Sequence, residues 1–129
     1  MFNSIQQFET AGIKNLRKAE DEFIRTRDMA NFINAIKGVV LHLGLDVIAE
    51  TLENYDAAIR KSPKRSEKWS VVRKDPKQLV TSLGTVQYRK TLFINKTTKE
   101  RSYLLDRELG LEKHQRITED AEAQLLTEA

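Results

Sequence analysis

Apolar residues near the N-terminus recur at roughly helical spacing. Between residues 4 and 27 they include Ile5, Leu16 and Phe23, and Ser4 can cap the first turn. Glycine lowers helix propensity by about 1 kcal/mol relative to alanine. We therefore predict a helix over residues 4–27 with a weak point at Gly12.

The next segment has a more regular pattern. From Asp28, a plausible N-cap, apolar residues recur in alternating steps of four and three, which is typical of a seam along which helices pack. The pattern predicts a helix over residues 28–61, roughly 50 Å long at 1.5 Å per residue. Such a rod must pack along another helix, from its own chain or from a partner. The predicted assembly seam consists of Met29, Ile33, Ile36, Val40, Leu43 and Val47.

After Pro63 the pattern changes to the two-residue period of strands. The apolar face of the strongest segment is interrupted by Lys90, which we expect to point inward or to lie at a bulge. Strands are predicted around Trp69 and residues 71–72, over 79–83, over 85–94 and over 102–105, with turns at Asp75 and Pro76, at Gly84 and at 95–99. A last helix is predicted from its cap at Thr118 to residue 129.

These elements predict an α+β fold with long N-terminal helices, a small antiparallel sheet of three to four strands, and a C-terminal helix. We expect two regions. Residues 1–62 would form a helical arm or a coiled-coil-like hairpin, and residues 63–129 a small basic sheet with its C-terminal helix. The pattern leaves open whether the two N-terminal helices pair within one chain or between chains.

Composition narrows the cellular setting. The 129 residues include no cysteine, and the N-terminus lacks the basic start and apolar core of a signal peptide. No apolar run approaches the roughly 20 residues of a membrane span. We therefore expect a cytoplasmic protein without a membrane partner.

Charge is distributed unevenly along the chain. Residues 60–101 hold thirteen of the 22 basic residues and three of the 19 acids, a net charge of +10, whereas the remainder is −7. A concentrated positive field attracts polyanions such as DNA. The alternative is a solubilising surface that blunts a sheet edge. The candidate DNA-binding residues are Lys61, Lys64, Arg65, Lys68, Arg73, Lys74, Lys77, Arg89, Lys90, Lys96, Lys99 and Arg101.

Catalytic chemistry is not indicated. His42 and Asp46 lie one helical turn apart, but two ligands are fewer than a zinc site needs. No glycine-rich phosphate loop and no gathered set of carboxylates is visible. We expect no catalytic residues, no metal, no cofactor and no small-molecule substrate, and so not an enzyme.

Several ordered motifs resemble a known family. They include TSLGTVQYRKTLF, in which a glycine turn leads into a basic strand, and YLLDRELGLEKHQRIT. The segment from about Phe32 onwards resembles the N-terminal part of the Lre-type bacterial insertion-sequence transposases, long catalogued as an uncharacterised family. The resemblance implies a longer parent protein with a DDE-type, RNase H-like catalytic domain downstream of this region.

The resemblance and the charge together predict a non-catalytic N-terminal region of a transposase. It would contribute DNA binding at the element termini and subunit assembly as a homo-oligomer during transposition, a form of DNA recombination. Two alternatives remain: a pure oligomerisation module, in which the helical seam is the function, and a truncated remnant reading frame without activity.

Overall fold

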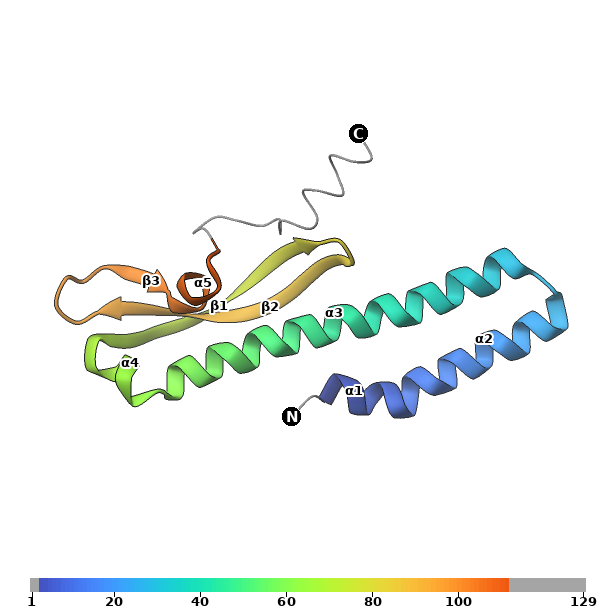
Figure 1. The fold of residues 1–129 in the computed structure, drawn as a ribbon, viewed down its shortest axis with the longest axis horizontal. Coiled ribbons are helices and arrows are strands. Elements are labelled where there is room, and N and C mark those ends of the chain that lie inside the picture. The colour runs from blue at the N-terminus through green and yellow to red at the C-terminus, as the bar shows by residue number, and fades with distance from the viewer. Residues whose placement is uncertain (1–2, 112–129) are drawn as a thin grey trace, which may run out of the picture. The chain divides into compact units, whose positions relative to one another are not determined.

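The computed structural model describes residues 3–111, which divide into two compact units, one ending at Ile48 and the other beginning at Ala49 (Figure 1). This boundary lies inside one continuous helix, so the helix contributes to both units. The expected division at residues 62 and 63 follows the change from helix to strand instead. The elements in chain order are α1 (Asn3–Gln7), η1 (Phe8–Gly12), α2 (Ile13–Thr26), α3 (Met29–Lys61), α4 (Pro63–Lys68), β1 (Trp69–Thr81), β2 (Gly84–Asn95), β3 (Arg101–Tyr103) and α5 (Leu104–Leu109).

The predicted first helix is confirmed, and its weak point is a structural feature. One turn, Phe8–Gly12, is π-helical and separates α1 from α2. A Cβ at Gly12 would collide with the ring of Phe8, four residues earlier. Glycine at this position therefore allows the Phe8 ring to lie against the backbone of the wider turn.

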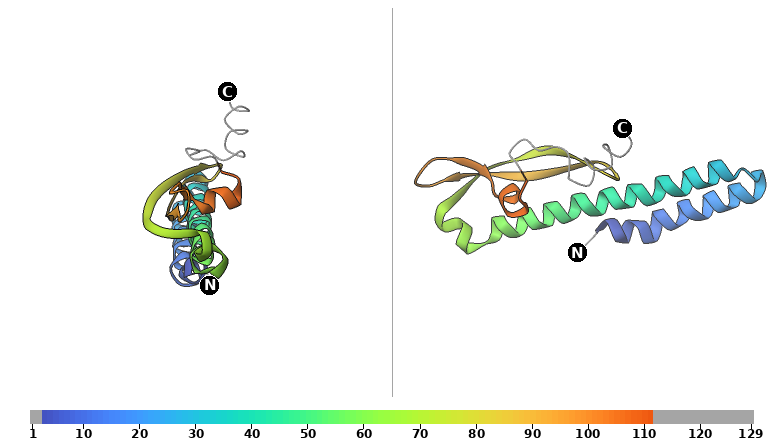
Figure 2. Two further views of the ribbon diagram at one scale, coloured as in Figure 1. Left: turned by 90° about the vertical axis from the view of Figure 1, so that its left-hand side faces the viewer. Right: turned by 45° about the horizontal axis from the view of Figure 1, so that its top comes forward.

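A tight connection turns the chain from α2 into α3. Arg27 has a left-handed backbone conformation with φ of 60°, and its N–H donates to the carbonyl oxygen of Phe23. The Asp28 carboxylate then accepts the N–H of Asn31 at 3.1 Å, which confirms Asp28 as the N-cap of α3. Within the first unit, α2 and the start of α3 lie side by side as an antiparallel hairpin (Figures 1 and 2).

The strands form one antiparallel sheet in the order β1-β2-β3. The predicted turn at Asp75 and Pro76 is wrong, because β1 continues through both residues and Pro76 lies opposite Arg89. A proline, which has no N–H to donate, is tolerated here because β1 is an edge strand. The predicted turn at Gly84 is confirmed, with a φ of 137° that favours glycine.

The third strand is shorter than predicted. β3 ends at Tyr103, and the chain then forms the short helix α5, which ends at Gly110 with φ of 71°. The described residues thus confirm the α+β class with a three-stranded sheet and a short helix after it. The helix predicted from Thr118 lies outside the described residues. The apolar core of the second unit consists of Leu79, Val86, Tyr88, Leu92, Phe93 and Leu105.

One expectation about α3 needs correction. By length and composition, α3 is apolar enough to cross a membrane, although no run of that size was expected from the sequence. This is weak support for a membrane span, because the core helix of a soluble protein passes the same test.

Candidate nucleic-acid interface

The structure gathers part of the basic array at one end of the sheet. The N–H of Lys96, in the turn after β2, donates to the carbonyl oxygen of Lys68 at 2.9 Å. The ammonium of Lys96 also donates to the carbonyl oxygen of Ser66 at 2.5 Å. Two segments about thirty residues apart in sequence are therefore joined. We call the exposed residues Lys64, Lys68, Lys96 and Lys99 of these two segments the basic end.

The turn that carries Lys96 and Lys99 is held by Asn95. Its side-chain oxygen accepts the N–H groups of Thr97 and Thr98 at 2.9 and 3.0 Å. Lys99 takes a left-handed conformation with φ of 63°. These hydrogen bonds from backbone N–H groups to the Asn95 side chain fix the turn that carries the two lysines.

A groove opens beside α4. It has a volume of about 370 Å³, and its polar and aromatic lining consists of Ser62, Lys64, Arg65, Lys68, Trp69, Arg107 and the acid Glu108. Arg107 of α5 places its guanidinium 5.4 Å from the centre of the Trp69 ring. A half-exposed indole beside cations combines the phosphate-binding and base-stacking groups that nucleic-acid sites use. The charge count over residues 60–101 missed Arg107, because this arginine lies in the net-acidic remainder of the chain.

Two predicted DNA contacts have other partners. The sequence predicted that Lys90 would either point inward or lie at a bulge, and the structure shows that it points inward. Its ammonium donates to the Asp106 carboxylate at 2.5 Å. Both side chains are less than a tenth exposed. The guanidinium of Arg65 donates to the carbonyl oxygens of Arg60 and Trp69. Lys90 is therefore removed from the surface array. Arg65 is half-buried and still lines the groove beside α4, where its hydrogen bonds to the two carbonyl oxygens hold it in place.

The remaining candidates lie along the sheet edges and helix ends. Arg73 is exposed but forms an ion pair with Asp75 at 2.8 Å, and Lys77 lies 5.0 Å from the centre of the Tyr103 ring. A second cavity is lined by Arg73, Arg101 and Arg107, together with acidic Glu100. Of these three arginines, Arg73 forms the ion pair with Asp75, and the carboxyl groups of Glu100 and Asp106 add negative charge to the lining. The other exposed candidates are Lys61, Lys74 and Arg89.

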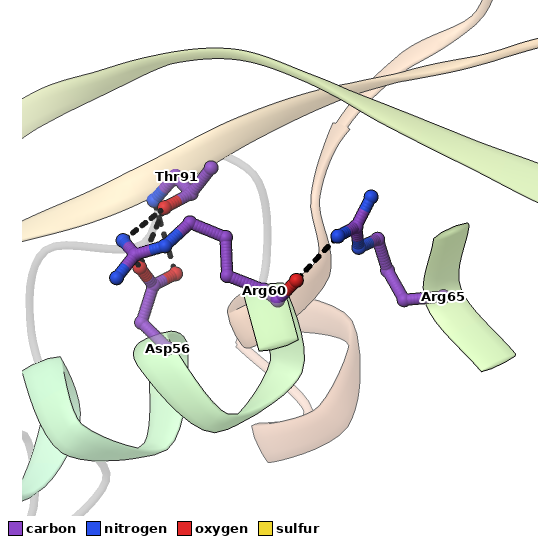
Figure 3. A network of polar contacts seen from close by, with 4 residues as sticks. All are labelled: Asp56, Arg60, Arg65 and Thr91. Atoms are coloured by element: carbon purple, nitrogen blue, oxygen red, sulfur yellow. Dashed lines mark hydrogen bonds and ion pairs between the residues drawn. The ribbon is translucent and has the colours of Figure 1, made fainter. Parts of the chain in front are cut away.

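A buried polar network orients the helix against the sheet in the second unit (Figure 3). The Asp56 carboxylate of α3 accepts the N–H of Thr91 at 3.0 Å and its hydroxyl at 2.6 Å. Arg60 Nη1 lies 3.5 Å from the same carboxylate and donates to the Thr91 hydroxyl at 3.2 Å. Arg65 then joins α4 to Arg60. Asp56 is 2% exposed, and nothing in the helical pattern distinguishes it from a solvated acid.

A second polar contact joins β3 to β1, the strand at the other edge of the sheet. The Tyr103 hydroxyl donates to Asp75 at 2.6 Å. This hydrogen bond, followed by the one from Arg73, lowers the pKa of Asp75. Burial, followed by the hydrogen bond to Asp75, raises the pKa of Tyr103 to about 12. Both directions agree with a neutral phenol that donates to an ionised carboxylate, although burial is the larger cause for Tyr103.

Residues 3–111 contain no group of three or more His, Asp or Glu side chains that could hold a metal ion. His42 Nε2 lies 3.2 Å from Asp46 Oδ2, as their spacing on one helix face implies. The pair lines a small cavity of the first unit that also includes Phe8 and Asn15. It provides two of the three or more ligands that a protein zinc site requires.

The six residues of the predicted assembly seam differ in how far they are exposed to solvent. Met29, Ile33 and Val40 are more than half exposed. The other three seam residues, Ile36, Leu43 and Val47, are half-buried.

Comparison with known proteins places the chain in a family. Residues 25–129 match uncharacterised protein family UPF0236, and the chain belongs to this family. Similar relatives are UPF0236 proteins of Caldanaerobacter subterraneus subsp. tengcongensis. One, named for eleven loci, is 31% identical over 110 residues, and another is 32% identical over 102 residues. The matches cover 85% and 79% of this chain but 24% and 22% of the relatives, so the chain spans about a quarter of their length. No solved structure matches the chain.

Proposed function

We propose that this chain is the non-catalytic N-terminal region of an insertion-sequence transposase and that it contributes DNA binding and subunit assembly. The observation that carries the DNA-binding part is the basic end. Four exposed lysines come together there from α4 and from the turn after β2, beside the groove that contains Trp69 and Arg107. Each lysine can neutralise one phosphate and release its counterions.

The transposase part rests on the sequence resemblance and is supported by how the relatives are named. One relative is named for eleven loci of a single strain, and another for four. A DNA element that copies itself would leave the same protein encoded at many loci of one genome. The location proposed for such a protein is the cytoplasm, where it would reach chromosomal DNA.

Catalysis is assigned to the remainder of a longer protein. The relatives are about four times as long as the matched region. By this proposal, the chain should not cleave or join DNA in magnesium or manganese. Metal-dependent cleavage that survives repurification and is lost on mutating one of its acids would contradict this assignment.

The DNA-binding proposal is tested by fluorescence anisotropy with duplex DNA at several salt concentrations. If about five phosphates are neutralised, the slope of log affinity against log salt should be near −4 to −5. Sequence preference should be weak, because lysines on loops contact phosphates more readily than base edges. Lys64→Glu with Lys68→Glu should weaken binding at least about tenfold and flatten the slope by about two.

The matched control is Lys14→Glu with Lys18→Glu. These lysines are also exposed and four residues apart on a helix, but they lie in the first unit. We expect the control to weaken binding less than about threefold, through net charge alone. Binding that does not weaken as salt rises, or that responds equally to both pairs, would reject the basic end as the interface. Lys90 is unsuitable for charge reversal, because the variant would bury two facing carboxylates.

The second candidate function is a pure assembly module. It is favoured by the exposed apolar residues Met29, Ile33 and Val40 of the hairpin. Self-association without DNA binding would support this candidate, and the absence of both would favour a remnant reading frame.

A further inference from the structure

The helical hairpin of the first unit has a second apolar face besides the one that joins its helices. On α2, Ile13 and Ile24 are 37% and 59% exposed, and on α3, Met29, Ile33 and Val40 are 53–55% exposed. Removing large apolar side chains of this kind from water is favourable, and it lowers the free energy by roughly 25 cal/mol for each Å² buried.

The inner face of the hairpin is fixed by contacts. The rings of Phe23 and Phe32 lie 4.9 Å apart, and Ala19 is buried. Further along, Asn15 of α2 and Val39 of α3 line the same small cavity. These residues define the sides of α2 and α3 that face each other.

Three of the five exposed apolar residues each follow an inner residue by one position. Ile24 follows Phe23, Ile33 follows Phe32, and Val40 follows Val39. One residue turns a helix by about 100°. Because α2 and α3 are antiparallel, the same rotation on both helices points their exposed residues to one side of the hairpin. We call Ile13, Ile24, Met29, Ile33 and Val40 the outer face.

The charges within the outer face suit a second copy. On α2, positions 13, 17, 20 and 24 recur in steps of four, three and four, so Arg17 and Glu20 lie between the two isoleucines. A two-fold axis presents the same surface on both copies. When two outer faces pair antiparallel, Arg17 of each copy can approach Glu20 of the other. A bilayer would instead remove both charged groups from water without offering either of them a further opposite charge.

We propose that the outer face is a homodimer interface through which two hairpins pair around a two-fold axis into a four-helix arrangement. This deepens the assembly part of the proposed function and does not require DNA binding. It also revises the predicted seam. Ile36 and Leu43 are half-buried within one chain, whereas Met29, Ile33 and Val40 join two chains.

Sedimentation equilibrium of the whole 129-residue chain tests this interface. The wild-type chain should dimerise at low micromolar concentration. Ile33→Asp should raise the dissociation constant about a hundredfold or more, because a carboxylate in an apolar interface loses its hydration. Asn31→Asp adds the same charge two residues away, on the opposite side of α3, and should change the constant less than about twofold.

A charge swap tests the pairing itself. Arg17→Glu and Glu20→Arg should each weaken the dimer about tenfold, and the double variant should restore it to within about threefold of wild type. Additive losses in the double variant would reject the two-fold pairing. Circular dichroism checks that each variant remains helical.

Two other results would overturn the interface. One is a wild-type chain that remains monomeric at high micromolar concentration. The other is an Ile33→Asp chain that dimerises as tightly as the wild-type chain. A chain that floats with neutral lipid vesicles without dimerising would show that the outer face contacts lipid instead. Lys64→Glu with Lys68→Glu should leave the dimer intact, so that failure of DNA binding and failure of assembly can be told apart.

Discussion

The two units of this chain are stabilised in different ways. Among the described residues, the hairpin unit buries just two residues, Ser4 and Ala19, and leaves a row of large apolar residues in water. The sheet unit buries an entire ion pair, Lys90 with Asp106, and a hydrogen-bonded carboxylate, Asp56. The hairpin surface is therefore suited to association. The sheet unit has an interior whose polar groups fit one arrangement.

This difference predicts where substitutions will be costly. A buried polar group requires its particular partner, because an unpaired charge in the interior loses its hydration without compensation. An exposed apolar residue has no such requirement in the monomer. We therefore expect the sheet unit to be intolerant of changes at a few polar positions and the hairpin to be tolerant on its outer face.

The largest expected effect is the loss of one partner of the buried ion pair. Lys90→Met should lower the free energy of unfolding by about 3–5 kcal/mol, because Asp106 remains buried without its ammonium partner. Denaturant unfolding followed by Trp69 fluorescence measures it, since this tryptophan belongs to the same unit. Adding Asp106→Leu should recover most of the loss. A double variant as unstable as the single one would show that packing, and not charge, is responsible.

A smaller loss is expected at the carboxylate that joins α3 to β2. Asp56→Ala should lower the free energy of unfolding by about 2–3 kcal/mol, because Thr91 loses the acceptor for its N–H and its hydroxyl. Glu53→Ala, at an exposed acid one turn earlier on α3, should change it by less than about 0.5 kcal/mol. Equal effects in the two variants would contradict a special role for Asp56.

The hairpin is sensitive at its π-helical turn. Gly12→Ala should lower its stability by about 1–3 kcal/mol, because the new methyl group meets the Phe8 ring. Gly38→Ala places the same group where it would meet no side chain and no other segment within 4 Å, and should raise stability by up to about 1 kcal/mol. Thermal unfolding followed by circular dichroism compares the two. A stabilising Gly12→Ala would mean that the turn converts readily to α-helix.

The smallest effect concerns the hydroxyl that joins β3 to β1. The pKa of Tyr103 is raised to about 12, so the stability that its neutral form contributes is complete below pH 10 and lost as pH rises through 12. The pKa of Asp75 is lowered, so the stability that its ionised form contributes is lost as pH falls through this lowered pKa. Tyr103→Phe should weaken both dependences, and tyrosine absorbance against pH should lose one group titrating near 12. Tyr88, also raised to about 12, remains as the internal reference.

The sequence was most informative where structure is local. The cap at Asp28, the glycine turn at Gly84 and the weak point at Gly12 were each identified from one residue and its neighbours. It was misleading at Pro76, because a proline reads as a turn unless the strand is known to lie at an edge. The charge count identified a basic region, yet Lys90 and Arg65 could not be separated from the exposed lysines.

What the sequence determined by itself was therefore the two N-terminal helices and the antiparallel sheet that follows them, because helical and strand periods are properties of neighbouring residues. It did not predict the short helices α4 and α5 or the continuity of β1 through Pro76. The tertiary structure decided which cations reach the surface, which acid lies in the core, and which side of the α3 seam is covered. Those outcomes depend on partners such as Thr91 for Asp56 and Asp106 for Lys90. Such partners are far away along the chain or on another element, and a charge or a hydrophobic residue has no place in the fold until the group opposite it is known.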